Sequence, residues 1–132
     1  MKKRILFLLL ILLILAGCGQ KGKENLNMEI GSYQQIIPQE AKAMMDGQDV
    51  IILDVREQSE YDEKHIPGAV LLPVGTITAE TAAAVIPEKD AAVLVYCRSG
   101  NRSKKASQAL ADLGYTGIYE FGGINDWPYE VE

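Results

Sequence analysis

The sequence is poor in the residues that usually hold metals or nucleotides. Its 132 residues include two cysteines, one histidine and one tryptophan. No group of His, Cys, Asp and Glu residues has the spacing of a metal site. A glycine-rich phosphate loop for nucleotides is also missing. The sequence therefore implies neither a metal nor an organic cofactor.

Positive charge is scarce as well. The chain has 13 basic and 18 acidic side chains, and three of the basic ones, Lys2, Lys3 and Arg4, stand at the N-terminus. Without residues 1–17, ten basic side chains face eighteen acidic ones, which gives a net charge of about −8. A domain this acidic argues against nucleic acid as a partner.

The N-terminus has an apolar run that is too short to span a bilayer comfortably. The run from Ile5 to Leu15 follows the basic cluster and precedes small residues, which is the layout of a secretory signal. The following "LAGC", ending at Cys18, resembles the lipobox of bacterial lipoproteins, where the cysteine is diacylated and becomes the first residue. A short membrane anchor with a chance cysteine is the alternative.

These features predict three segments. Residues 1–17 are expected to be a lipoprotein signal peptide, residues 18–31 a lipidated tether, and residues 32–132 the folded domain. Two acyl chains would satisfy the two-signal requirement for stable anchoring. We therefore expect a monomer that is anchored in the cell membrane by lipid on Cys18 and faces the extracytoplasmic side. If Cys18 is acylated, Cys97 has no disulfide partner within the chain.

Buried-strand and helix patterns alternate through the rest of the sequence. Expected strands lie within residues 49–56, 66–73, 90–96 and 117–121, and expected helices within 33–48, 76–87 and 103–114. Continuous apolar strands between helices predict a single α/β domain whose central sheet is mainly parallel and covered by helices on both faces.

Cys97 follows the strand at 90–96, at the edge of the sheet where α/β proteins bind ligands. The loop amides and the start of the next helix favour the thiolate there, and Arg98 and Arg102 add positive charge. Gly100 lets the loop curl. The pattern predicts a nucleophilic cysteine, whereas the alternative is a structural cysteine that packs as a small hydrophobe.

Four segments resemble the single-domain rhodaneses, a family of sulfurtransferases, over residues 33–127. They are "LDVREQSEY" (Leu53 to Tyr61), "HIPGAVLLP" (His65 to Pro73), "CRSGNR" (Cys97 to Arg102) and "GGINDW" (Gly122 to Trp127). The resemblance implies a rhodanese-like fold and a sulfane sulfur carried as a persulfide on Cys97.

The same resemblance assigns roles to the loop. The expected substrate-binding residues are Arg98, Ser99, Gly100, Asn101, Arg102 and Ser103. The donor would be a small anion such as thiosulfate, and the acceptor a thiol or another thiophilic group. Asp54 and Arg56 are expected to support the loop structurally. The resemblance places His65 in a structural turn, and a catalytic His65 paired with the thiol is the alternative.

Loop length separates this chemistry from that of phosphatases. Cysteine phosphatases place five residues between cysteine and arginine, whereas four residues separate Cys97 from Arg102. The tighter ring of amides suits a single sulfur atom better than a phosphate. A module that binds or carries a persulfide without turnover remains the competing interpretation.

Overall fold

The computed structural model describes residues 31–132. Residues Gly31–Glu132 form one compact unit. The predicted signal peptide, the lipidation at Cys18 and the tether up to residue 30 lie outside the described residues.

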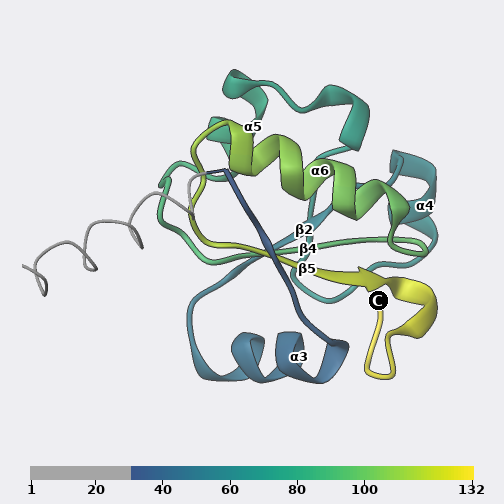
Figure 1. The fold of residues 1–132 in the computed structure, drawn as a ribbon. Helices are drawn as coiled ribbons and strands as arrows, with labels where there is room; N and C mark the ends of the chain where they lie inside the picture. Colours follow the sequence, from purple (N-terminus) through teal and green to yellow (C-terminus); the bar gives the residue numbers. More distant parts are fainter. Residues whose placement is uncertain (1–30) are drawn as a thin grey trace, which may run out of the picture. The chain divides into compact units, whose positions relative to one another are not determined.

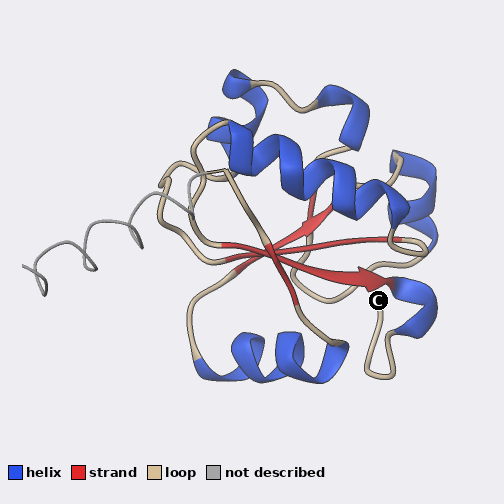
Figure 2. Cartoon of the chain, viewed as in Figure 1, coloured by secondary structure: helices blue, strands red, loops and turns tan. Residues whose placement is uncertain are grey.

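A five-stranded sheet runs through the middle of the unit, and all of its strand pairs are parallel (Figures 1 and 2). The strand order is β1-β5-β4-β2-β3. The bounds are β1 Gln34–Gln35, β2 Ile51–Asp54, β3 Val70–Leu71, β4 Val93–Cys97 and β5 Ile118–Gly123. The last strand, β5, therefore lies between the first strand and β4.

Four α-helices surround this sheet, and Figure 1 shows α5 and α6 on one face with α3 on the other. Their bounds are α3 Pro38–Gly47, α4 Gln58–Glu63, α5 Ala79–Val85 and α6 Asn101–Asp112, with 3-10 turns at Val74–Thr76 and Ile124–Asp126. Pro38 occupies the first turn of α3, where its missing N–H costs nothing. Within residues 31–132, no helix is long and apolar enough to cross a membrane.

The side chains of β4 alternate between two hydrophobic clusters. Val93, Val95 and Cys97 pack in the cluster that includes Ala106 and Leu110 of α6. Leu94 and Tyr96 pack in the second cluster, which includes Ala41 of α3. Because both faces are buried, the strand reads as one continuous apolar run. The predicted α/β domain with helices on both faces is confirmed.

The pairing of β4 with β5 changes register where β4 ends. Val95 is opposite Glu120, but Cys97 is opposite Gly123, so β5 carries one extra residue at this point. Gly122 lies within the offset with φ +90°, a conformation that favours glycine. The bulge places the Gly122–Gly123 corner directly beside the cysteine.

Candidate active site

Cys97 is the last residue of β4, and the loop that follows leads into α6. Gly100, immediately before the helix, has φ +108° and its N–H lies 3.0 Å from Cys97 Sγ. The left-handed turn at Gly100 thus directs a backbone N–H at the sulfur. The Cys97 side chain is 1% exposed, so solvent barely reaches it.

The pKa of the Cys97 thiol lies below its ordinary value. Burial alone would raise this pKa, but hydrogen bonds from Ser103 and from the amides of Gly100 and Ser99 outweigh burial. Unpaired amides at the start of α6 have no carbonyl partners within the helix and are free to stabilise negative charge. The site therefore favours a thiolate at the expected position.

The two predicted anion-binding arginines differ in their surroundings. Arg98 is exposed, as are Ser99 and Asn101. Arg102 instead makes two hydrogen bonds to the Glu60 carboxylate of α4, at 2.7 and 3.0 Å. The hydrogen bond from Arg102 lowers the pKa of Glu60 to about 2. Glu60 therefore stays ionised and balances the charge of Arg102.

Ser103 connects the thiol to a buried carboxylate that the sequence analysis missed. Its Oγ lies 3.4 Å from Cys97 Sγ and 2.7 Å from Glu120 Oε1 of β5. Gly122 N–H also donates to this oxygen, at 2.9 Å. Glu120 is 3% exposed and Ser103 fully buried. A lone acidic residue in an otherwise apolar strand was the signal that could have revealed Glu120.

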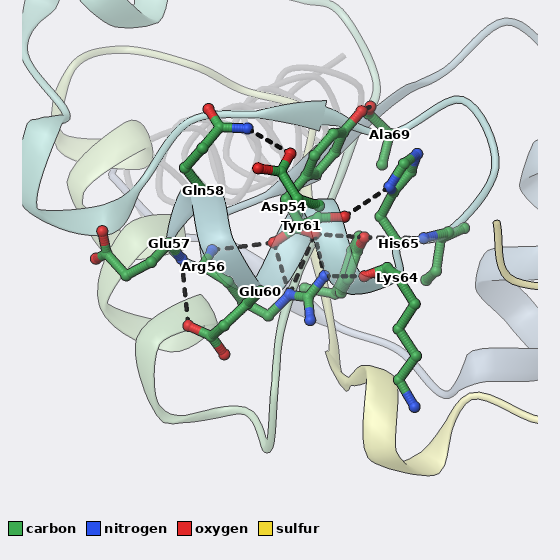
Figure 3. A network of polar contacts seen from close by, with 12 residues as sticks. Asp54, Arg56, Glu57, Gln58, Glu60, Tyr61, Lys64, His65 and Ala69 are labelled. Atoms are coloured by element: carbon green, nitrogen blue, oxygen red, sulfur yellow. Dashed lines mark hydrogen bonds and ion pairs between the residues drawn. The ribbon is translucent and has the colours of Figure 1, made fainter.

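Asp54 and Arg56 form a buried ion pair at the end of β2, with 2.7 Å between Arg56 Nη2 and Asp54 Oδ2 (Figure 3). Arg56 Nη2 also donates to the Lys64 carbonyl at 2.7 Å. Tyr96 Oη donates to Asp54 at 2.7 Å and accepts from Ile66 N at 3.1 Å. The pair thus acts on the loop through Tyr96, the residue before Cys97, and through the turn at 64–66.

His65 lies in that turn and has partners other than the thiol. Its Nδ1 is 2.9 Å from the Tyr61 carbonyl and its Nε2 is 3.1 Å from Glu132 Oε1. Its ring stacks on Tyr61 with 3.8 Å between centroids. These contacts support the structural interpretation of His65.

Trp127 is 9% exposed and packs in the second hydrophobic cluster, the one that includes Ala41 of α3, so it is a core residue.

Gly123 explains why two glycines follow one another in β5. A Cβ at residue 123 would overlap the backbone of Arg98 and Ser99. Asn125 N–H also donates to the Arg98 carbonyl at 3.2 Å. The cysteine loop is therefore pressed against the β5 corner, and no side chain fits between them.

Two hollows illustrate where ligands have room. A polar groove of about 140 Å³ beside the loop is lined by Arg56, Glu60, Glu63, Lys64, Arg98, Ile124 and Asn125. A larger cavity of about 440 Å³ lies between α3 and the C-terminal segment. No residue of the cysteine loop lines it, so we assign it no part in the chemistry. In the described part of the chain, no group of three His, Cys, Asp or Glu side chains is arranged to hold a metal ion.

The fold and the site define a parallel α/β domain with a buried cysteine at the carboxyl end of a central strand and a backbone amide of the next loop directed at its sulfur. The "Rhodanese-like domain" family matches residues 37–129. The chain belongs to this family.

Known relatives agree with this assignment. Thiosulfate sulfurtransferase PspE of Escherichia coli K12 is 36% identical over 74 residues, which is 56% of this chain and 70% of the relative. Putative sulfur carrier protein YrkF of Bacillus subtilis is 32% identical over 115 residues, 86% of this chain and 60% of YrkF. A solved rhodanese with anions from E. coli has 31% identity and a TM-score of 0.60, covering 64% of this chain and 98% of that one.

Proposed function

We propose that this protein is a sulfurtransferase that carries a sulfane sulfur on Cys97. The observation that carries the proposal is the Gly100 amide directed at Cys97 Sγ, 3.0 Å away, in a loop that lowers the pKa of the thiol. A relative named for thiosulfate sulfurtransferase activity and one named as a putative sulfur carrier support this class of chemistry.

The proposed reaction has two displacements. The Cys97 thiolate attacks the outer sulfur of thiosulfate, the S–S bond of the donor breaks, and its electron pair leaves with sulfite. The negative charge of Cys97 thereby moves to the outer sulfur of a persulfide, where the loop amides can hold it. A thiolate acceptor then attacks that outer sulfur, and the electron pair returns to Cys97 Sγ.

Intact-mass measurement of the purified protein after treatment with thiosulfate tests this proposal. We expect a species heavier by one sulfur atom, with the sulfur on Cys97, which disappears when a thiol acceptor is added. Cys97→Ser should take up no sulfur. Wild-type protein that stays unmodified with thiosulfate and with a persulfide donor would refute the proposal.

A carrier that receives sulfur from a partner protein is the second candidate. The ion pair between Arg102 and Glu60 favours it, since only Arg98 then offers unbalanced positive charge in the loop. Thiol to persulfide exchange depends on access and thiolate fraction more than on anion capture. Rapid loading from a protein persulfide with slow loading from thiosulfate would support the carrier.

We also propose that the domain acts at the outer side of the cell membrane, anchored by lipid on Cys18. The sequence "LAGC" after a short apolar run supports this location. Cys18→Ala should leave the precursor uncleaved and without diacylglycerol in metabolic labelling. Normal processing and lipidation of that variant would refute the anchor.

A further inference from the structure

Glu120 is a buried carboxylate at the floor of the cysteine loop. It is 3% exposed, and no cation within residues 31–132 forms an ion pair with it. Its Oε1 accepts hydrogen bonds only from Ser103 Oγ and Gly122 N among the described residues. Burying a carboxylate without a cation is costly, so its place behind the nucleophile calls for an explanation.

The Ser103 hydroxyl has one proton and several neighbours that accept it. The nearest acceptor is Glu120 Oε1 at 2.7 Å, followed by the Gly100 carbonyl at 2.9 Å, while Cys97 Sγ is 3.4 Å away. A carboxylate is also the strongest acceptor of these. While Glu120 is ionised, the hydroxyl therefore turns its proton mainly to Glu120, which weakens the hydrogen bond by which Ser103 lowers the pKa of Cys97.

We propose that Glu120 is a positioning residue that destabilises negative charge on Cys97 Sγ and thereby favours the persulfide over the free thiolate. Its charge acts on Sγ directly and through the direction of the Ser103 hydroxyl. Sulfur uptake moves the negative charge from Sγ to the outer sulfur, further from Glu120, so repulsion decreases as the persulfide forms. The persulfide part of this inference rests on the proposed function.

The other charges near the thiol come from α6, α4, the cysteine loop and the end of β2. Arg102 of α6 attracts the thiolate, and Glu60 of α4 balances it. Arg98 in the loop is exposed to solvent. The Asp54–Arg56 pair at the end of β2 is balanced within itself. Glu120 is thus the buried carboxylate beside the sulfur that no cation in residues 31–132 balances.

Glu120→Gln tests the proposal because it removes the charge and keeps the shape. From the pH dependence of Cys97 alkylation, we expect the midpoint of thiolate formation to fall by about one pH unit. Glu80→Gln, at an exposed position of α5, removes the same charge from an element outside the cysteine loop and should leave the midpoint unchanged. Ser103→Ala keeps the Glu120 charge, so its midpoint should not fall.

The persulfide readout uses a fixed ratio of thiosulfate to sulfite at a pH where Cys97 is ionised in both proteins. Intact-mass measurement should then show several-fold less persulfide, relative to thiolate, in Glu120→Gln than in wild type. A midpoint that stays or rises in Glu120→Gln would overturn the proposal. A wild type that takes up no sulfur would instead refute the proposed function. The alkylation midpoints would then still test whether Glu120 destabilises the thiolate.

A measurement on the wild type keeps the proposal open to refutation if Glu120→Gln does not fold. In protein labelled with ¹³C at glutamate carboxyls, the Glu120 resonance should change at the pH where Cys97 titrates. The change should vanish in Cys97→Ser. A Glu120 resonance that ignores the titration of Cys97 would overturn the proposal.

Discussion

At the scale of single residues, the thiol is the group whose environment the structure defines most closely. Hydrogen bonds from Ser103 and from the amides of the loop outweigh the burial of Cys97 and lower its pKa below the ordinary value. We expect alkylation of Cys97 to follow a midpoint below about 8.5, the value of a free cysteine. Iodoacetamide labelling across pH, with Cys97→Ser as the blank, measures it. A midpoint at or above that of free cysteine would contradict the activation argument.

Glu60 controls how much positive charge the loop shows to an anion. Its ion pair with Arg102 balances the charge beside the thiol. Glu60→Gln should therefore lower the KM for thiosulfate roughly threefold with little change in kcat, in keeping with the modest strength of part-exposed ion pairs. Asp62→Asn removes an exposed charge from the same helix without touching Arg102 and is the matched control.

Arg102→Ala should have the opposite effect on KM, because it leaves the Glu60 charge without its partner near the site. The KM values of these variants for thiosulfate show whether the charge of this pair affects donor binding. Equal KM values in all of them would exclude a role for the pair in donor capture and would favour loading by a protein.

At the scale of secondary-structure elements, the contact between β5 and the cysteine loop sets the shape of the site. Gly123→Ala would force a methyl group into the backbone of Arg98 and Ser99. We expect a loss of about 1–3 kcal/mol in the free energy of unfolding and a strong loss of persulfide formation. Gly75→Ala is the control, since a Cβ there meets nothing within 4 Å. Unchanged sulfur uptake in Gly123→Ala would show that the loop shape is not critical.

Tyr96 links β4 to the end of β2 and to the turn at 64–66. Tyr96→Phe removes the hydroxyl that donates to Asp54 and accepts from Ile66 N, leaving both buried partners short of a hydrogen bond. We expect about 1–3 kcal/mol of destabilisation in urea unfolding. Tyr119→Phe, at a half-buried position of β5, removes a hydroxyl that lies outside this network and should cost less. Similar losses in both variants would argue against the network.

Much of this arrangement was predictable because it depends on local patterns. The apolar run before Cys97 predicted a strand buried on both faces, and β4 covers Val93–Cys97. The patterns within residues 33–48 and 76–87 predicted the helices α3 and α5. The helix after the cysteine begins at Asn101, two residues before the predicted start, because Gly100 already completes the turn.

Contacts that depend on how distant elements are placed could not be predicted from the sequence. The pairing of Arg102 with Glu60 joins residues 42 positions apart, and nothing local distinguishes Glu60 from its acidic neighbours on α4. Glu120 stood out as a lone acidic residue in an apolar strand, but its position beside Ser103 depends on the bulge in β5, which cannot be predicted from the alternation of residues. Long-range side-chain geometry decided both cases.

At the scale of the whole molecule, acid should weaken the fold partly through Glu60. Its pKa falls from 4.5 to about 2 on pairing with Arg102, so the pair stabilises the folded state above pH 4.5. This contribution is lost as the pH falls from about 4.5 to about 2. We expect it to be about 1 kcal/mol, because solvent screens a part-exposed pair. Urea unfolding of wild type and Glu60→Gln should differ at pH 6 and converge near pH 2, and a constant difference would contradict this.

The order of strands also governs when the domain can fold during synthesis. The last strand, β5, lies between β1 and β4, so the sheet stays divided until residues Ile118–Gly123 have left the ribosome. Until then β4 has one open edge and β1 has no neighbour, and the pairing of β1 with β5 joins the two ends of the described domain. A nascent chain stopped before β5 should thus be sensitive to protease and prone to aggregation, whereas the finished chain closes its sheet in one late step.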